Sequence, residues 1–242
     1  QISLCAVMVK VAVVAKHPER AGPLLRDLSS HGFEVGRSNP DIVISFGGDG
    51  TALRGERLYP GIPRVMIKHS SICARCPDHD YTTLLEALGG GEYKIVRQIK
   101  VEAVKGDLRV VGLNEINVHH QLPFAVRLSV QVDNEDIAEN VICDGVIGAT
   151  PYGSSGYFHS IAGYSFGSGL GVAFIAPTRP VESRVVKETE TIRVYIVRGP
   201  GLLLADNDSK MVPLVTGDEV YVRRASEYAQ IVEVLGTTKV TV

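Results

Sequence analysis

Before Gly91, short apolar runs alternate with segments whose apolar side chains recur at helical spacing. Continuous β-branched runs of this length are typical of buried strands, and a period of about 3.6 residues is typical of helices. The expected strands lie at residues 4–15, 33–35, 41–46 and 64–67, and the expected helices at residues 19–31, 51–59 and 81–88. Strands and helices in alternation favour a parallel, Rossmann-like sheet, in which ligands lie beyond the carboxyl ends of the strands.

After Gly91 the pattern changes to many β-rich segments that turn residues separate. These segments lie at residues 93–104, 108–119, 125–133, 137–149, 171–176, 191–197, 201–206, 220–224 and 230–235. Turn signals such as Lys105-Gly106-Asp107 and Gly217-Asp218 fit a mostly antiparallel arrangement. We therefore predict an α/β domain at residues 1–92 and an all-β, sandwich-like domain at residues 93–242. The last strand is a candidate to pack back on the first domain.

The composition argues against two classes of partner. The 25 Lys and Arg residues balance 27 Asp and Glu residues, so no basic field for nucleic acid is present. The apolar runs are shorter than the roughly 20 residues that span a bilayer, and the start of the chain is typical of a strand rather than of a signal peptide. Four irregularly spaced cysteines do not make a disulfide framework, so we expect a reducing, cytoplasmic setting and no membrane partner.

The strand expected at residues 41–46 ends abruptly at Gly47-Gly48-Asp49-Gly50-Thr51. Glycines allow positive φ and a close approach of the backbone to a ligand, and free N–H groups at a helix start can cradle a phosphate. A carboxylate inside such a cradle points to chemistry, because it could hold Mg²⁺, bind a hydroxyl group or accept a proton. The simpler alternative is a strand-to-helix turn with Asp49 as the N-cap.

Two further groups of residues carry polar side chains suited to a ligand. Asn114-Glu115 lies in a strand-like run, and at a strand end or bulge both side chains could meet one ligand, with the glutamate accepting bonds from a ribose diol. The alternative is a pair of exposed strand residues. Residues 144–163 carry Asp144, a loop of Gly, Ser and Thr, and then a short helix. This loop is either a simple turn or a binding loop with Tyr157 as a stacking ring.

In their order and spacing, three motifs resemble those of the NAD kinase family. They are Gly47-Gly48-Asp49-Gly50-Thr51, Asn114-Glu115, and Asp144-Gly145 followed by Thr150-Pro151-x-Gly153-Ser154. The first motif is shared with the diacylglycerol and sphingosine lipid kinases, whereas the ordered trio is specific to NAD kinases. The motifs span residues 41–163, and the two-domain pattern extends the resemblance over the whole chain.

The resemblance implies an N-terminal α/β domain, a C-terminal β domain and an active site between them. It implies Mg²⁺-dependent transfer of a phosphoryl group from ATP, or from polyphosphate, to the 2′-hydroxyl of the adenosine ribose of NAD, which makes NADP. Family members are oligomeric, so a homodimer or homotetramer is expected. Two alternatives stay open: a kinase with the same glycine motif that acts on another hydroxyl, of a lipid or a sugar, and a non-catalytic dinucleotide-binding regulator.

Carried over by position, Asp49 would bind or deprotonate the acceptor hydroxyl. The residues around it would cradle the donor phosphates: Gly47, Gly48, Gly50 and Thr51. Asn114 and Glu115 would hold the adenosine part of NAD, and Asp144 would contact the nicotinamide-side ribose or amide. The other residues that would line the dinucleotide site are Thr150, Ser155, Gly156, Tyr157 and Ser160. These roles agree with phosphoryl transfer, where catalysis is mostly positioning and neutralisation of charge.

Residues 67–77 depart from the family, which has a stretch close to GxNxGxLGF here and uses part of it for the adenine pocket. The glycines are absent, and Ala74 stands about where the aromatic residue is expected. Arg75 could stack on the base instead, and Lys68 is either a phosphate partner or a solvated lysine. These changes leave adenine recognition open. Further departures are Tyr152, Gly156 and Phe158.

His69, Cys73, Cys76 and His79 are candidate zinc ligands close together in the sequence, and the two cysteines have metal-site spacing. Free or buried thiols with solvated histidines are the alternative. The sequence does not distinguish ATP from polyphosphate as the donor, NAD from NADH as the acceptor, or a dimer from a tetramer.

Overall fold

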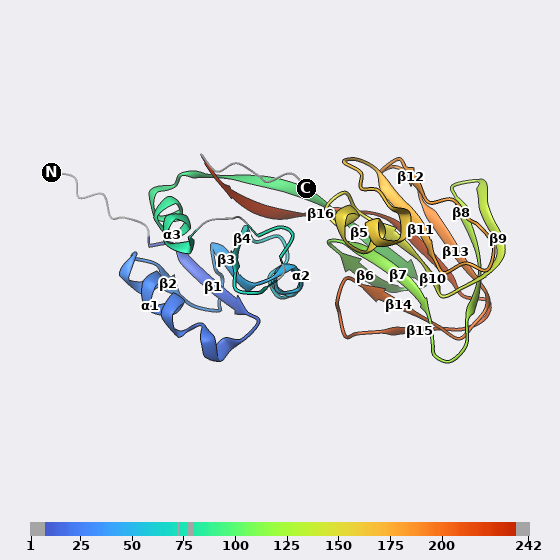
Figure 1. Ribbon diagram of the computed structural model, residues 1–242, viewed down its shortest axis with the longest axis horizontal. Coiled ribbons are helices and arrows are strands. Elements are labelled where there is room, and N and C mark those ends of the chain that lie inside the picture. The colour runs from blue at the N-terminus through green and yellow to red at the C-terminus, as the bar shows by residue number, and fades with distance from the viewer. Residues whose placement is uncertain (1–7, 72, 77–79, 236–242) are drawn as a thin grey trace. The chain divides into compact units, whose positions relative to one another are not determined.

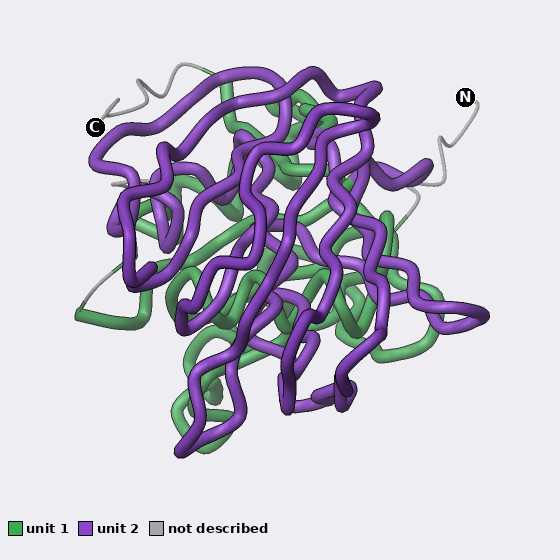
Figure 2. The backbone as a smooth tube through the Cα atoms, turned by 90° about the vertical axis from the view of Figure 1, so that its right-hand side faces the viewer, with its two compact units in different colours: residues 1–97, 229–242 green, residues 98–228 purple. Residues whose placement is uncertain are grey.

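The computed structural model describes residues 8–71, 73–76 and 80–235. The described chain divides into two units, which Figure 2 colours separately. Unit 1 takes the residues up to Arg97 and those from Ala229 onward, and unit 2 takes Gln98 to Tyr228. Two long strands belong to both units, because the chain leaves unit 1 along β5 (Tyr93–Lys105) and returns to it along β16 (Glu219–Val234).

Unit 1 is built on a parallel sheet (Figure 1). Its other strands are β1 (Lys10–Ala15), β2 (Glu34–Val35), β3 (Ile42–Gly47) and β4 (Arg64–Lys68). Its helices are the 3-10 turn η1 (Pro18–Arg20), α1 (Gly22–Ser30), α2 (Asp49–Leu58) and α3 (Tyr81–Gly90). The strand order is β2-β1-β3-β4, and the end of β16 continues the sheet beside β4, where Ile231 is paired with Arg64.

Alternate side chains of β3 face opposite sides of this sheet, as the two-residue period of a strand requires. Ile44 and Phe46 belong to an apolar core that also takes leucines of α1 and α3. On the other side, an added Cβ at Gly55 of α2 would come within 3.6 Å of the Val43 side chain. Helices α1 and α3 therefore cover one face of the sheet, and α2 covers the other.

Unit 2 contains two antiparallel sheets. Its strands are β6 (Leu108–Gly112), β7 (Glu115–His120), β8 (Val126–Val132), β9 (Glu135–Cys143), β10 (Gly145–Ala149), β11 (Leu170–Ile175), β12 (Arg184–Val186), β13 (Ile192–Arg198), β14 (Gly201–Ala205) and β15 (Val212–Leu214). One sheet runs in the order β16-β13-β8-β9, with β5 pairing β16 and β6. The other runs in the order β12-β11-β10-β7-β14-β15.

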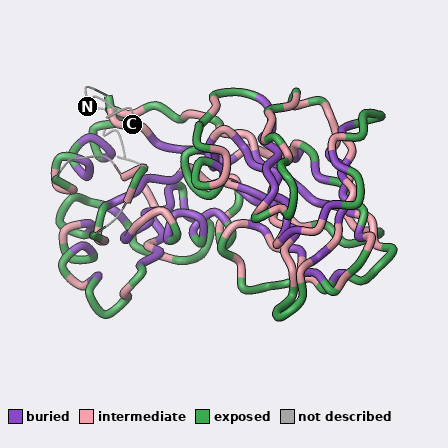
Figure 3. Tube along the Cα trace, turned by 45° about the vertical axis from the view of Figure 1, so that its right-hand side comes forward, coloured by how far each residue is buried: buried purple, intermediate pink, exposed green. Residues whose placement is uncertain are grey.

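The core of unit 2 is a cluster of apolar side chains from both of its sheets. Val126 and Leu128 of β8 are buried, whereas Arg127 between them is only partly buried. This is the alternation of a strand with one covered face. They join Val118 and Val146 of the other sheet in one apolar cluster. Figure 3 shows such buried stretches running along the strands. Strand β10 is buried at every position, because Phe158 packs with it in a second cluster.

Two predicted strands are each divided where the chain passes from one sheet of unit 2 to the other. The run at residues 108–119 forms β6 in one sheet and β7 in the other, and the run at residues 137–149 forms β9 and β10 in the same way. The crossings lie at Leu113-Asn114 and at Asp144. They place two of the candidate binding motifs at strand ends.

The predicted fold class, an α/β part followed by a β-rich part, is confirmed. Some boundaries differ. The helix expected at residues 19–31 is divided into η1 and α1, because Pro23 occupies the first turn of a new helix. Helix α2 begins at Asp49 rather than at Thr51. In the part of the chain that the structure describes, no helix has the length and apolar character needed to cross a membrane.

Candidate functional site

The glycine motif connects β3 to α2 in unit 1. Gly47 is the last residue of β3, Gly48 precedes the helix with a φ of −130°, and Asp49 is the first helical residue. A Cβ on Gly47 would lie 2.3 Å from Thr51 Oγ1, so a larger residue would displace the buried threonine. Gly47, Gly48 and Gly50 all have ordinary φ angles. Position 47 therefore needs glycine for close packing, and the expectation of a positive φ in the motif is wrong.

Main-chain N–H groups of a neighbouring loop hold the Asp49 carboxylate. The N–H of Ala74 donates to Oδ2 at 2.8 Å, and the N–H of Arg75 donates to Oδ1 at 3.1 Å. The N-cap of α2 is Gly48, so the simpler alternative of an N-cap role for Asp49 is wrong. A carboxylate in the first turn also interacts favourably with the helix dipole. Asp49 thus has a fixed position in the first turn of α2.

A disulfide between Cys73 and Cys76 closes the loop that contacts Asp49. The Cys76 sulfur lies 3.9 Å from the main-chain oxygen of Gly47, which places the loop beside the glycine motif. Zinc prefers thiolate ligands, and a disulfide removes both thiolates from the four candidate zinc ligands. His79 lies outside the described residues, within which no three His, Cys, Asp or Glu side chains cluster as a metal site. The expectation of unpaired cysteines is therefore wrong for this pair.

In unit 2, a buried carboxylate organises the crossing that carries Asn114 and Glu115. Asp206, just after β14, accepts three main-chain hydrogen bonds: from Leu113 at 2.8 Å, Asn114 at 2.7 Å and Glu115 at 3.1 Å. Its φ of 52° is left-handed, as expected for a turn residue. The sequence predicts a turn at Asp206-Asn207-Asp208 and does not reveal this second role, since an aspartate after a strand is common in turns.

The loop after β10 packs directly on the same crossing. The N–H of Thr150 donates to the main-chain oxygen of Asn114 at 2.8 Å, and the Thr150 hydroxyl donates to that of Leu113 at 2.6 Å. A Cβ on Gly153 would lie 2.3 Å from the Asn114 oxygen, so this position requires glycine. The Thr150 side chain is fully buried. We infer that it supports the loop, together with the buried Tyr152 and Ser154, while Ser155, Gly156 and Tyr157 further along are exposed.

Those following residues form the short helical turns η2 (Ser154–Phe158) and α4 (His159–Ala162), with an irregular backbone at Gly156. Ser155, Gly156 and Ser160 are exposed. Burial raises the pKa of the Tyr157 hydroxyl, and the negative charges of Asp144 and Glu115 raise it further. Tyr157 is therefore close enough to Asp144 and Glu115 for their charges to act on its hydroxyl.

Asp144 lies at the second crossing between the sheets of unit 2. Its main-chain oxygen accepts the N–H of His120 at 2.7 Å, and its carboxylate is 3.8 Å from His120 Nδ1. Its side chain is about half exposed. Asp144 can therefore reach a ligand from a backbone position that the sheet fixes.

Two buried oxygen atoms in this group lack a hydrogen-bond partner among the described residues. They are Oδ1 of Asn114 and Oε2 of Glu115. Burial raises the pKa of Glu115 to about 8, and the nearby Asp206 carboxylate adds to the effect. Buried polar atoms in folded proteins are nearly always bonded. The two oxygens are suited to accept hydrogen bonds from a ligand that brings N–H or O–H groups.

The raised pKa of Glu115 leads to a prediction about stability and pH. Between the ordinary value of 4.5 and the folded value of about 8, the folded chain holds a proton that the unfolded chain has lost. The free energy of unfolding should therefore fall as pH rises through this range, by up to about 1.4 kcal/mol per unit. We expect Glu115→Gln to reduce this slope and to be more stable than the wild type at pH 8. Urea unfolding at several pH values measures both effects.

The exposed Glu86 provides the control, because Glu86→Gln removes a carboxyl group that water solvates. Its unfolding free energy should follow the pH dependence of the wild type. Equal slopes for Glu115→Gln and the wild type would show that Glu115 ionises normally in the folded protein.

Removing the Asp206 carboxylate should disturb the site and the fold together. Asp206→Ala leaves three main-chain N–H groups without an acceptor, which should cost about 3 kcal/mol of unfolding free energy or more. Asp206→Asn keeps one acceptor oxygen and should lose less. Asp208→Ala, which removes the acceptor of the Lys210 N–H in the same turn, is the control. Thermal and urea unfolding measure the loss of stability, which should be largest for Asp206→Ala and smaller for Asp206→Asn and Asp208→Ala. A loss of unfolding free energy below about 1 kcal/mol in Asp206→Ala would contradict this prediction.

Residues 113–234 match the model of the ATP-NAD kinase C-terminal domain. The chain belongs to the NAD kinase family. The matched segment begins at the first crossing of unit 2 and includes Asn114, Glu115, Asp144 and Asp206. The family resemblance seen in the sequence is therefore confirmed.

Comparison with known proteins extends this NAD kinase likeness over nearly the whole chain. The chain is 27% identical over 233 aligned positions to the NAD kinase of Saccharolobus islandicus strain M.14.25, covering 92% of this chain and 93% of that protein. It is 28% identical over 212 positions to the NAD kinase of Caldanaerobacter subterraneus, covering 81% of this chain and 75% of that protein. Both alignments extend well beyond the segment that the domain model matches.

Solved structures of NAD kinases share the fold. The crystal structure of an NAD kinase from Archaeoglobus fulgidus in complex with ATP superposes with a TM-score of 0.79, at 25% identity and over 94% of both chains. Yeast NADH kinase complexed with NADH gives a TM-score of 0.81 at 16% identity, over 97% of this chain and 90% of that one. The second comparison supports the fold alone, because its sequence identity is low.

Proposed function

We propose that this protein transfers the terminal phosphoryl group of ATP, or of inorganic polyphosphate, to the 2′-hydroxyl of the adenosine ribose of NAD. Membership of the family supports the proposal, since the Saccharolobus and Caldanaerobacter relatives are named NAD kinase. The observation that carries it is the pair of buried acceptors, Asn114 Oδ1 and Glu115 Oε2, without partners in the described part of the chain. A ribose diol and an adenine amino group supply the donors that these acceptors need.

The proposed reaction moves one phosphoryl group and one proton. The ribose oxygen forms a bond to the terminal phosphorus of the donor, and the bond from that phosphorus to its bridging oxygen breaks. The bridging oxygen keeps the electron pair, so ADP or a shortened polyphosphate leaves. The hydroxyl proton passes to the Asp49 carboxylate, and NADP is formed. A ribose hydroxyl is a weak nucleophile, so a positioned base contributes about 10²- to 10⁴-fold to the rate.

In this proposal the glycine motif holds the donor phosphates at the start of α2. Gly47, Gly48, Gly50 and Thr51 surround Asp49 there, and the N-terminus of a helix attracts anions. On unit 2, Asn114 and Glu115 bind the adenosine part of NAD. Asp144, Ser155, Gly156, Tyr157 and Ser160 are assigned to the rest of the dinucleotide.

Mg²⁺ fits the groups that are present. This ion is usually held by one or two carboxylates together with substrate phosphates and water, and not by a cage of protein ligands. Asp49 is a carboxylate beside the proposed donor site, and within the described residues no cluster of three ligating side chains competes with it. When bound with the donor, Mg²⁺ would neutralise charge on the phosphate oxygens.

Two other functions are less well supported. A lipid or sugar kinase with the same glycine motif has no evident need for the buried acceptors of Asn114 and Glu115. A non-catalytic regulator would bind the dinucleotide through them, but it would not require a carboxylate held in place at Asp49. The homo-oligomeric state implied by the resemblance and the cytoplasmic setting expected from the cysteine pattern stay predictions.

The test is NADP formation from NAD with ATP and Mg²⁺, detected with an NADP-specific dehydrogenase. Parallel reactions with polyphosphate, and with NADH as the acceptor, identify the preferred pair of substrates. We expect NADP with at least one donor, and a higher melting midpoint in the presence of NAD. A protein that binds NAD but makes no NADP with any donor would favour the regulator. Phosphorylation of a lipid or sugar without any response to NAD would favour the other kinase.

A further inference from the structure

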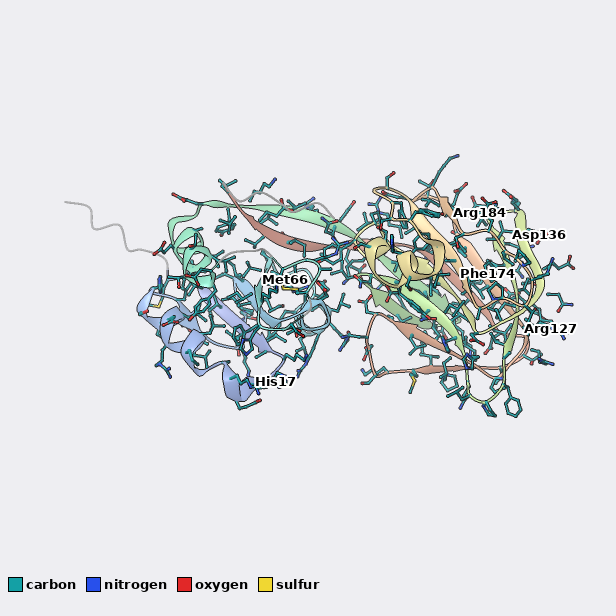
Figure 4. The ribbon with its side chains drawn as sticks, in the orientation of Figure 1. His17, Met66, Arg127, Asp136, Phe174 and Arg184 are labelled. Carbon is teal, nitrogen blue, oxygen red and sulfur yellow. A yellow bond between two sulfur atoms is a disulfide. The ribbon has the colours of Figure 1, made fainter. Side chains whose placement is uncertain are left out.

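A disulfide closes residues 73–76 into a ring beside Asp49. Cys73 and Cys76 are its ends, and their Cα atoms are 5.5 Å apart. Figure 4, in which a disulfide is a yellow bond, labels Met66 of β4, the strand that precedes this loop in the chain. Both cysteines are only partly buried, so a small thiol can reach the bond between them. A disulfide that thiols can reach is open to reversible exchange with them.

Both main-chain groups that hold the Asp49 carboxylate lie inside this ring. Ala74 and Arg75 are the residues between the cysteines, and their N–H groups donate to Oδ2 at 2.8 Å and to Oδ1 at 3.1 Å. Successive N–H groups converge on one anion only where the backbone between them turns in a suitable way. The ring holds that turn, because it ties the two ends of the segment together. The hydrogen bonds to Asp49 therefore depend on the disulfide.

The sulfur atoms of the ring also lie against the glycine motif. Cys76 Sγ is 3.9 Å from the main-chain oxygen of Gly47, and Cys73 Sγ is 3.5 Å from Asp49 Oδ1. A disulfide sulfur carries no hydrogen, so it cannot donate to that oxygen. A thiol at the same place donates a weak S–H hydrogen bond. Reduction therefore adds a donor at the carboxylate oxygen that Arg75 already bonds, at the same time as it opens the ring.

We propose that Cys73 and Cys76 form a reversible redox site, which a dithiol reduces and which controls the position of the Asp49 carboxylate. In this step the S–S bond breaks, and two electrons pass to it from the dithiol, which becomes a disulfide. The two thiol protons of the dithiol end on Cys73 and Cys76. The oxidised form is the more active one, because the closed ring holds Asp49 in place. The inference rests on the proposed kinase function, in which Asp49 is the base.

Rates of NADP formation by the oxidised and the reduced full chain test the redox site. Dithiothreitol, or its oxidised form, sets the state of the protein, and titration of thiols after denaturation confirms that the disulfide has been broken or formed. NADP is measured by chromatography after quenching, so that no coupling enzyme meets the dithiol. We expect kcat to fall about tenfold on reduction, as for the loss of one hydrogen bond to a charged group, with the KM for NAD unchanged. Reoxidation should restore the rate.

Two variants separate this pair from the other cysteines. The double variant Cys73→Ala/Cys76→Ala should turn over at the rate of the reduced wild type, whether or not dithiothreitol is present. Cys143→Ala is the matched control, because Cys143 is a free, buried thiol of unit 2. It should keep the ratio of the oxidised to the reduced rate. A wild type with equal kcat in both states, or a disulfide that dithiothreitol does not break in the folded protein, would overturn the inference.

Hydrogen exchange of the main-chain N–H groups of Ala74 and Arg75 keeps the redox site and the proposed function apart. Both groups should exchange faster after reduction, because an amide that has lost its hydrogen bond is open to water. Faster exchange in a protein that forms no NADP in either state would support the hold of the ring on Asp49 and refute the kinase proposal. Unchanged exchange, with NADP formed at one rate in both states, would refute the redox site and leave the kinase proposal intact.

Discussion

Replacing Asp49 with asparagine should lower the rate of NADP formation about 100-fold or more. The amide cannot accept the proton of the ribose hydroxyl, and loss of a positioned general base typically costs about 10²- to 10⁴-fold. Asparagine also offers one acceptor oxygen where the carboxylate uses two, so one of the bonds from Ala74 and Arg75 is lost. Turnover at saturating NAD and ATP measures the effect. Because the dinucleotide is assigned to residues of unit 2, calorimetry should show that NAD still binds.

The matched control for this substitution is Asp80→Asn. Asp80 is an exposed carboxylate at the start of α3 in the same unit, and its side chain makes no capping hydrogen bond. Its replacement should leave the rate of NADP formation within about twofold of the wild type, as is usual for surface changes. Full activity in Asp49→Asn would refute the role of Asp49 as the base and would leave it as a structural anchor for the loop at residues 73–76.

Breaking the buried ion pair of Glu56 and Arg64 should cost about 3–5 kcal/mol of unfolding free energy. Glu56 of α2 and Arg64 of β4 are 97% and fully buried, and their side chains approach to 2.7 Å. Arg64→Met leaves a carboxylate without its counter-charge in a site that water does not reach. Urea unfolding of Glu56→Leu, Arg64→Met and the double variant measures the coupling, and we expect the double variant to lose much less than the sum.

An ion pair with one largely exposed partner, in the same unit, provides the comparison. Lys94 and Glu233 are 3.2 Å apart, and the lysine is largely exposed. Lys94→Met should cost less than about 1 kcal/mol, because surface ion pairs contribute little. A similarly small loss in Arg64→Met would mean that water reaches the Glu56 carboxylate. The pair would then add little to the attachment of α2 to the sheet.

The division into an α/β part and a β-rich part could be predicted, because the spacing of apolar residues along the sequence follows the burial of the strands and helices. Strand β3 is buried at every position and β8 at every second position, and their apolar patterns show both. The two crossings between sheets could not be predicted. The two crossings, at Leu113-Asn114 and at Asp144, interrupt segments that stay apolar on both sides. Which strand each half of a segment pairs with depends on residues far away in the sequence.

The candidate site was predictable to a similar extent. Three glycines around a carboxylate are typical of a ligand-binding loop, so the chemical interest of Asp49 is visible in the sequence, whereas the packing of Gly47 against Thr51 is not. Its hydrogen bonds to the loop at Ala74 and Arg75 join positions 25 and 26 residues apart, and those of Asp206 join positions 91 to 93 residues apart. Such contacts depend on the folded arrangement.

The return of β16 to unit 1 has a consequence for the order in which the protein folds during synthesis. Gln230 donates to the oxygen of Gly61 at 2.6 Å, and Val232 belongs to the core of unit 1. All of unit 2 therefore leaves the ribosome before this part of unit 1 does. Until then β4 is the open edge of a parallel sheet, and open edges pair readily with other chains. We expect the nascent protein to depend most on chaperones in the interval between the synthesis of β4 and the synthesis of the last turns of β16.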